Sequence, residues 1–500
     1  MQLISVRFFI WIVLTLVIYR VVPEKYRFAV LLCSSIAFYL LVGIFSLFVI
    51  LIFTLSSYLL ALLIERQDGQ GSVLSSLEGQ KRNRSRAKKK SYPITVAAVL
   101  LLVSFWIIIR ELSPYSAVGM SFYALRIISY LIDVYRGKIR AQRNLQKYLL
   151  FTSFFPLAFL GPVVSYGEVA ESLFKGAKPS YDDTLSGAYR ISVGVFKKVV
   201  IANALSTPLS LIAVEPQRYF GAYTLFLLIF YTVEIYCDFS GGIDICLGAS
   251  RMLGIDLPEN FKRPFASENV REFWNRWHIT LGEWFEHYVF YPLSFSKPMQ
   301  KMSRLCRRRF GSRVGKRLPL YAATLFTWLL TGLWHGSEGH FVAWGLVNGL
   351  IVLVSQELSR PTAEFWDKHP RARDSGLRTV FSRVCVFVLI GAVRLLDVYR
   401  SAPLTAKMLL SVFYRFDSYT ELFSGSIFDL ISHETFAVVI AALVILYLPE
   451  LFGRSVVSPS QKPIAASFFI VSLALCAMLF GTYGIGFDAS DFIYSHFNGG

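Results

Sequence analysis

Two histidines, His278 and His335, each directly follow a tryptophan in an otherwise apolar sequence. A neutral imidazole can take a proton from an attacking hydroxyl, which is the usual work of a general base. His335 ends an apolar run that begins at Leu318, and Gly332 and Gly336 stand on either side of it. Glycines beside a reactive side chain let backbone or substrate come close. We therefore take His335 as a candidate catalytic base.

His278 lies in the segment Asn269–Phe290, which combines many aromatic with many charged side chains. That mixture is typical of an amphipathic helix at a membrane interface or buried in protein. On such a helix, Trp274, Trp277 and His278 share one face, since their offsets are zero, three and four. Asn275 precedes His278 by three residues and could orient it. A histidine at a membrane interface with no chemical role is the equally open alternative for His278.

Three carboxylates, Glu234, Asp238 and Asp244, lie in the apolar run Tyr223–Ile245. Charged residues at membrane depth are costly and are rarely found without a partner or a function. We expect Asp238 and Asp244 to be structural and to pair with a nearby arginine or lysine. A catalytic acid is the less favoured interpretation.

The composition indicates a membrane protein. The chain has 500 residues, of which 54% are hydrophobic, and its mean hydropathy is +0.50. Only helices and closed barrels satisfy their backbone in lipid, and continuous rather than alternating apolar runs favour helices. We predict an all-α polytopic protein with eleven or twelve spans, plus broken or interfacial helices, in a single membrane domain covering residues 1–500.

The expected spans follow the apolar runs. Phe28–Ile64 is too long for one span and should bend near Gly43. Tyr148–Leu160 is broken by Pro156, and broken apolar segments usually line a cavity. The other expected spans are Leu3–Tyr19, Ile94–Ile109, Met120–Val134, Ala188–Val214, Tyr223–Ile245, Pro319–Trp334, Phe341–Ser355, Val380–Leu396, Phe436–Leu451 and Ala466–Tyr483. Leu3–Tyr19 has no small-residue cleavage site after it, so we expect a retained helix.

The net charge of +18 comes largely from basic runs between the apolar segments. Such runs stay on the cytoplasmic side, so we place Lys81–Lys90 and Lys297–Arg317 in cytoplasmic loops and the N-terminus outside. Lys297–Arg317 could also help to dock an acidic donor. This distribution argues against a nucleic-acid partner. The six cysteines form no C-x-x-C pair, and we predict neither a disulfide framework nor a metal site.

Several motifs occur in a characteristic order. They are G-M-S-F-Y-A-L-R-I-I-S-Y-L-I-D-V-Y-R-G-K-I (119–139), Y-C-D-F-S-G (236–241), R-M-L-G-I-D-L-P-E-N-F-K-R-P-F (251–265), E-F-W-N-R-W-H-I-T-L (272–281), and G-L-W-H-G (332–336) followed by F-V-A-W-G-L-V-N-G (341–349). They resemble the membrane-bound O-acyltransferase family, and within it the bacterial alginate O-acetylation membrane proteins and D-alanyl-teichoic-acid transferases. The resemblance covers about residues 100–355. A C-terminal membrane extension over about 380–500 suits the polysaccharide-acetylating branch better.

The resemblance implies an O-acyltransferase of the bacterial plasma (inner) membrane. It implies transfer of a small acyl group, acetyl above all, from a cytoplasmic thioester donor, either acetyl-CoA or an acyl carrier protein. The acceptor would be an extracytoplasmic envelope polysaccharide, reached directly or through a periplasmic or extracellular SGNH-type partner. His335 and His278 would be the catalytic residues, and Asn275, Trp274, Trp277 and Trp334 would shape the substrate pocket. Because a thioester is already activated, we expect no metal and no bound cofactor.

Three alternatives remain open. The first is D-alanyl transfer to teichoic acid from an acyl carrier protein. The second is a channel or transporter whose buried charges line a pathway, and the third is a non-catalytic scaffold for secreted glycan-modifying enzymes. A transporter would carry flux without thioester turnover, which separates it from both acyltransferases.

Overall fold

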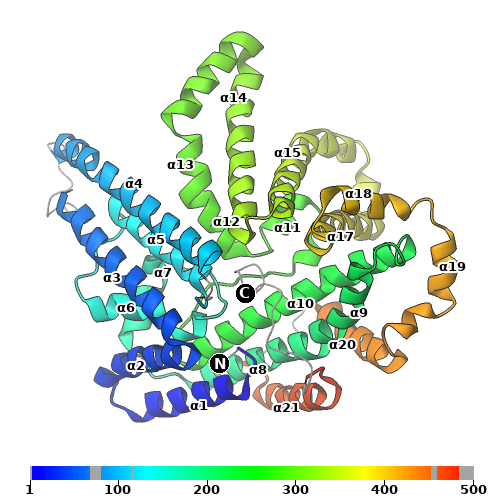
Figure 1. The fold of residues 1–500 in the computed structure, drawn as a ribbon, viewed down its shortest axis with the longest axis horizontal. Helices are drawn as coiled ribbons and strands as arrows, with labels where there is room; N and C mark the ends of the chain where they lie inside the picture. Colours follow the sequence, from blue (N-terminus) through cyan, green and yellow to red (C-terminus); the bar gives the residue numbers. More distant parts are fainter. Residues whose placement is uncertain (1–2, 68–79, 114–116, 452–458, 484–500) are drawn as a thin grey trace.

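The protein is built from helices around one long central helix, as the computed structural model shows for residues 3–67, 80–113, 117–451 and 459–483 (Figure 1). Within those ranges there is no strand, and a single isolated bridge pairs Phe261 with Trp277. Eight of the described helical segments are long and apolar enough to cross a membrane. The prediction of an all-α polytopic fold is therefore confirmed. Among the described residues these eight are fewer than the eleven or twelve spans that we predicted. The expected spans Leu3–Tyr19 and Met120–Val134 fall on helices of 16 and 17 residues, too short for that criterion. Pro319–Trp334 and Phe436–Leu451 are also not among the eight.

The N-terminal third forms a bundle of its own, drawn in blue and cyan in Figure 1. As expected, one helix ends at Val42 and the next begins at Ile44, on either side of Gly43. The break at Pro156 is also present, because proline fixes its own φ and supplies no N–H. The elements are α1 (Val6–Val21), α2 (Glu24–Val42), α3 (Ile44–Gln67), α4 (Gln80–Leu112), α5 (Met120–Arg136), α6 (Leu145–Ser153), η1 (Phe155–Leu157) and α7 (Tyr166–Lys175).

The central helix α10 (Ala222–Met252) packs along α8 (Tyr181–Phe196), which continues through the π-helical turn η2 (Lys197–Ala202) into α9 (Asn203–Val214). Two glycines of α10 make this contact possible. A Cβ on Gly241 would stand 2.7 Å from the carbonyl oxygen of Gly194, and one on Gly248 would stand 2.6 Å from that of Gly187. Small residues let two helix backbones approach closely, as is common between membrane helices.

The segment after α10 is not the single amphipathic helix that we predicted over Asn269–Phe290. It is divided into η3 (Pro264–Ala266), α11 (Val270–Trp274), α12 (Ile279–Phe285), the π-helical turn η4 (Glu286–Phe290) and α13 (Tyr291–Ser294). His278 has a left-handed backbone with φ of 49°. The predicted common face of Trp274, Trp277 and His278 is therefore wrong. The buried side chain of Asn260 accepts a hydrogen bond from the Thr280 amide, 20 positions along the chain. This tertiary contact favours a new helix, α12, where the local sequence predicts that α11 continues.

The predicted loop Lys297–Arg317 is instead a helical hairpin that projects from the body (Figure 1). It belongs to α14 (Lys297–His335), which Gly311 divides with φ of 82° and ψ of 168°. The Ser303 hydroxyl donates to the Gly315 carbonyl across the hairpin. The predicted loop over Lys81–Lys90 is also helical, within α4. Residues 68–79, the rest of that predicted loop, lie outside the described residues.

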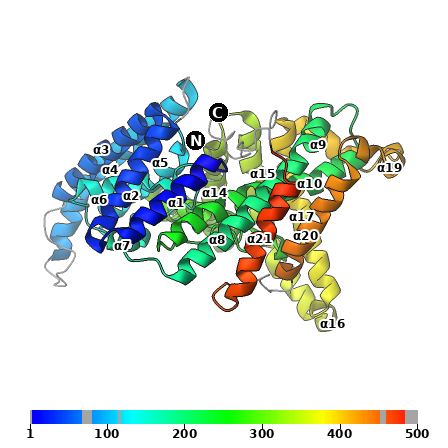
Figure 2. The ribbon, with the colours of Figure 1, turned by 90° about the horizontal axis from the view of Figure 1, so that it is seen from below.

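The helices that follow α14 complete the fold. They are α15 (Gly339–Asp367), α16 (Pro370–Arg373), α17 (Gly376–Tyr399), α18 (Ala402–Ser411), α19 (Asp417–Phe423), η5 (Ser426–Asp429), α20 (His433–Leu451) and α21 (Pro463–Phe480). Helix α17 packs on both α10 and α15, while α21 packs on α8 (Figure 2). The segment that we expected to be an extension thus reaches the centre of the molecule.

Candidate active site

His335 is the last residue of α14, at the point where the chain turns into α15. Its side chain is buried, with 6% exposure. The imidazole lies between two indoles, 4.9 Å from the Trp334 ring and 5.0 Å from the Trp344 ring between centroids. This aromatic setting leaves little of the imidazole exposed to solvent.

The glycines around His335 allow Phe341 of α15 to pack closely against them. A Cβ on Gly336 would stand 2.0 Å from the Phe341 ring, and one on Gly332 would stand 2.4 Å from the Phe341 carbonyl oxygen. These contacts explain why both positions need glycine. The close approach that we predicted is therefore made by Phe341 of α15, which presses the end of α14 into place.

An arginine from the N-terminal bundle binds the backbone of this turn. Arg110, near the end of α4, donates to the carbonyl oxygens of Trp334 at 2.7 Å and of His335 at 2.9 Å. The last carbonyls of a helix have no partner within that helix. Arg110 supplies the missing donors for the histidine itself and for the residue before it.

His278 stands at the start of α12, in the left-handed conformation described above. Its side chain is 4% exposed. The ring packs 4.8 Å from Phe239 of α10 and 6.1 Å from Trp334, measured between centroids. The two histidines thus meet the same indole, although 57 positions separate them in the sequence.

Hydrogen bonds around Asn260 define the tautomer of His278. The Thr280 backbone N–H donates to Asn260 Oδ1 at 3.2 Å, which identifies that atom as the oxygen. The Thr280 hydroxyl accepts from the Val163 amide at 2.9 Å and donates to the same Oδ1 at 2.9 Å. His278 Nδ1 lies 3.2 Å from this oxygen and must therefore carry the proton. The Nε2 atom of the neutral ring is then the nitrogen with the lone pair.

The environment keeps His278 neutral. It lies outside the eight candidate membrane spans. Burial, followed by the positive charge of Arg394, lowers the pKa of His278 to about 3. The ring is consequently an uncharged acceptor over the whole physiological pH range.

Arg394 of α17 is a cation in the wall of the same cavity as the two histidines. Its guanidinium lies 5.0 Å from the Trp277 ring centroid and 5.3 Å from that of Trp344, with Asp397 3.3 Å away as its ion-pair partner. A guanidinium held between two indoles gains cation–π stabilisation that is larger when water is excluded. Arg394 therefore fixes two tryptophans of the cavity wall in place.

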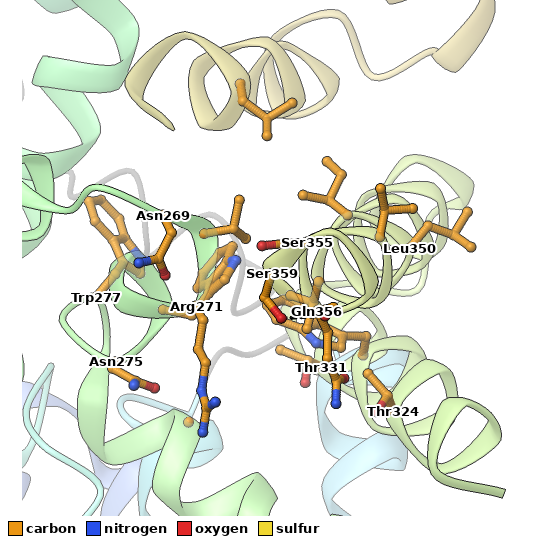
Figure 3. A pocket seen from close by; sticks show the side chains of 18 of the residues that line it. Asn269, Arg271, Asn275, Trp277, Thr324, Thr331, Leu350, Ser355, Gln356 and Ser359 are labelled. Atoms are coloured by element: carbon orange, nitrogen blue, oxygen red, sulfur yellow. Dashed lines mark hydrogen bonds between the residues drawn. The ribbon is translucent and has the colours of Figure 1, made fainter. Parts of the chain in front are cut away.

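Both histidines and Arg394 open into one cavity of about 1280 Å³. It runs along the apolar half of α14 and along α15. Figure 3 shows Thr331 of α14 and Gln356 and Ser359 of α15 on one side of this space, across from Arg271 and Asn275. A large cavity lined by polar, apolar and aromatic side chains, with two buried imidazoles among them, is suited to an extended substrate.

The predicted pocket residues have different places. Trp274 and Trp277 line the cavity, and Trp274 packs 4.7 Å from the Trp328 ring. Asn275 lines it too, but with an exposed side chain. Trp334 lies behind the histidine rings, against Phe122 at 5.7 Å. We assign the orientation of His278 to Asn260, where we had expected Asn275.

Asp238 and Asp244 of α10 each take part in ion pairs. Asp238 accepts from Lys198 Nζ at 2.5 Å. Asp244 accepts from Lys197 Nζ at 2.8 Å and from Arg190 Nε at 3.0 Å. All three cations come from α8 and η2, so these ion pairs join α10 to its neighbour. The pairing that we expected is present, and it supports a structural role for both aspartates.

Three residues of the site were not predicted from the sequence: Asn260, Arg110 and Arg394. Arg394 interrupts an apolar run and Arg110 directly follows one, which was a usable signal. Asn260 carried no such signal, because an asparagine in a Pro-Glu-Asn turn is ordinary loop composition. Among the described residues, no group of three or more His, Cys, Asp or Glu side chains could hold a metal ion.

Comparison with known proteins places the sequence among membrane acyltransferases. The sequence model of the membrane-bound O-acyltransferase family matches residues 31–306 and 308–397. A probable alginate O-acetylase of Pseudomonas syringae pv. tomato is 34% identical over 50% of this chain and 44% of that protein. A peptidoglycan O-acetyltransferase of Helicobacter pylori is 29% identical over 51% and 50% of the two chains, respectively.

A third relative, a teichoic acid D-alanyltransferase of Bacillus subtilis, is 30% identical over 51% of this chain and 64% of that protein. The chain thus spans about half the length of the curated relatives it matches. The family match extends further than the resemblance that we noted over residues 100–355. It includes Arg394, and hence all the site residues described above.

Proposed function

Because this chain belongs to the membrane-bound O-acyltransferase family, we propose that it transfers a small acyl group, acetyl, from a thioester to a hydroxyl of a cell-envelope polysaccharide. The observation that carries this proposal is the shared cavity, into which His278 and His335 both open. The names of the relatives support the class of acceptor, since each of them refers to an envelope polymer.

The proposed reaction needs only acid–base chemistry. The acceptor oxygen attacks the thioester carbonyl carbon, and its proton passes to His335 as the new C–O bond forms. The C–S bond then breaks, and the proton moves from His335 to the departing sulfur. The products are an ester and a free thiol, so charge and protons balance without a metal or a redox partner.

His278 would act as a hydrogen-bond acceptor. Because Nδ1–H is directed to Asn260, the Nε2 lone pair is the part of the ring that can hold the hydroxyl of the acceptor. Burial lowers the pKa of His278 and of His335 alike, so both rings are neutral acceptors, and the role of His278 is assigned from the hydrogen bond that holds its Nδ1–H. This assignment divides the work, with His278 orienting the nucleophile and His335 drawing off its proton.

We assign the arm of the cavity that runs along α15 to the thioester donor. The arm reaches Ser355 and Ser359, on either side of Glu357, and Glu357 pairs with Arg317 at the base of the basic hairpin. Basic segments next to membrane spans stay in the cytoplasm, where acetyl-CoA and acyl carrier proteins are found. The donor would therefore enter from the cytoplasmic side of a bacterial plasma membrane. The acceptor glycan, or an SGNH-type partner protein that carries the acyl group onward, would be met on the other side.

The test is the ester content of the envelope. Envelope polysaccharides from cells with and without the gene are treated with mild base, and the released acids are identified by mass. We expect loss of ester-linked acetate when the gene is absent. Loss of ester-linked alanine would instead establish the D-alanyl alternative, which the 30% identity to a D-alanyltransferase keeps in view. An unchanged ester content would refute both acyltransferase proposals.

A further inference from the structure

We propose that Arg110 and Glu111 form a latch that positions the catalytic turn of His335, so that the N-terminal bundle controls the rate of the chemical step. Arg110 would be a positioning residue, because it acts through the backbone of the turn. The inference rests on the proposed role of His335.

The first half of the latch is a pair of hydrogen bonds from Arg110. The two terminal nitrogens of Arg110 bind two consecutive carbonyls, those of Trp334 and His335. Only 6% of the Arg110 side chain is exposed, and its guanidinium lies 5.3 Å from the Trp106 ring centroid. A planar guanidinium with rigid, paired donors restricts direction as well as distance. The peptide group between the two residues is therefore held in orientation, and with it the Cα of His335.

The second half holds the other side of the turn. Glu111 accepts a hydrogen bond from the Ser337 hydroxyl at 2.9 Å, and its second oxygen lies 3.4 Å from Arg110 Nε. Consecutive residues of α4 thus bind the chain immediately before and after Gly336. On the opposite side, Phe341 fills the space that a Gly336 side chain would take. The turn is consequently enclosed between α4 and α15.

This arrangement bears on catalysis because His335 is at a helix end. A residue within a helix is held by the ladder of hydrogen bonds on both sides, whereas the final residue is held on one side only. Without Arg110, the carbonyls of Trp334 and His335 lose their donors, and the imidazole can drift from the reacting oxygen. Displacements of about 1 Å from a reactive geometry cost on the order of a hundredfold in rate.

A matched arginine elsewhere separates positioning from general stability. Arg126 of α5 is buried, and it also donates to two consecutive carbonyls, those of Phe151 and Thr152, at 3.4 and 3.1 Å. Those carbonyls belong to α6, away from the cavity. Both arginines bind two consecutive carbonyls at a helix end, but only Arg110 touches the catalytic turn.

The experiment uses the full-length protein in lipid nanodiscs with acetyl-CoA and a soluble oligosaccharide acceptor. Thiol release gives kcat and KM for wild type and for Arg110→Gln, Arg110→Lys and Arg126→Gln. We expect Arg110→Gln to lower kcat about ten- to a hundredfold, with the donor KM within about twofold of wild type because the donor arm of the cavity is intact. Arg110→Lys keeps the positive charge, and its kcat should lie between those of wild type and Arg110→Gln. Arg126→Gln should keep its kcat per folded molecule.

Hydrogen–deuterium exchange of residues 332–341 gives a second readout that does not depend on turnover. Exchange should quicken in Arg110→Gln and stay unchanged in Arg126→Gln. If wild type turns over and His335→Gln does not, yet Arg110→Gln keeps wild-type kcat, the latch is refuted while the proposed function stands. If wild type releases no thiol, direct transfer from acetyl-CoA to a free oligosaccharide is refuted, and the exchange measurement tests the latch. Unchanged exchange in Arg110→Gln would then refute the latch by itself.

Discussion

Replacing Asn260 by aspartate should make the enzyme sensitive to pH. In the native protein, Asn260 Oδ1 accepts a hydrogen bond from Nδ1–H of His278. The pKa of His278, about 3, keeps its ring neutral. Aspartate has the same shape and keeps an oxygen for His278 and for both donors of Thr280. It adds a negative charge next to the ring, which stabilises the imidazolium and raises its pKa.

The size of the shift follows from the distance. A full charge at the 3.2 Å that separates Nδ1 from Oδ1 would contribute about 5 kcal/mol at an effective dielectric constant of about 20, or about four pKa units. The carboxylate shares its charge between two oxygens, and Arg394 still opposes protonation. We therefore expect a rise of about two to three units, to a pKa of about 5 to 6.

The raised pKa of His278 determines how kcat of Asn260→Asp changes with pH. Above the raised pKa the His278 ring is neutral and Nε2 has its lone pair, so turnover should approach that of wild type at pH 8. As the pH falls through the raised pKa, the lone pair is lost and kcat should fall, about tenfold by one unit below it. Wild type should show no such loss between pH 5 and 8, because its His278 titrates far lower.

The assay is kcat for thiol release between pH 5 and 8 in nanodiscs. Asn203→Asp serves as the control, since Asn203 is also buried but binds the Thr482 carbonyl, away from the cavity. It should have a wild-type pH profile. A profile for Asn260→Asp that superimposes on that of wild type would refute the tautomer assignment and the acceptor role of His278.

Three further predictions concern the rest of the chain. Cysteines introduced into Lys81–Lys90 and Lys297–Arg317, in a cysteine-free background, should resist an impermeant reagent in intact cells, because both segments are expected in the cytoplasm; strong labelling of either would reverse the orientation. His278→Ala should insert normally and lower turnover by on the order of 10²–10⁴-fold, and full activity would leave it a packing residue. Asp238→Ala removes the carboxylate that pairs with buried Lys198, so it should destabilise the protein by on the order of 3–5 kcal/mol. An unchanged thermal unfolding midpoint would contradict that structural role.

Much of the architecture could be predicted because it depends on local sequence. The apolar runs indicated the helices, and Gly43 and Pro156 marked real breaks, since both residues act on their own backbone. His278 and His335 were identified because ionisable side chains in apolar surroundings are rare. That they open into one cavity adds to this interpretation.

What could not be predicted depends on contacts between distant residues. The helical pattern around Trp274 and His278 was strong, yet the chain turns left-handed at His278, where Asn260 takes the Thr280 amide. Periodicity carries no information about a hydrogen bond from 20 residues away. Arg110 lies 225 residues from His335, and only the packing of α4 against the end of α14 brings them together. The precise geometry of the site is therefore a tertiary property.

The most direct test of the central claim is acyl transfer by His335→Gln. Glutamine keeps much of the bulk and hydrogen bonding of histidine but cannot act as a base at neutral pH. The stability of a helical membrane bundle is spread over many contacts, so the variant should reach the membrane at the wild-type level. At matched expression, we predict that envelope polysaccharides from cells with His335→Gln carry no more ester-linked acyl groups than those from cells without the gene. Near-normal acylation by this variant would remove His335 from the mechanism.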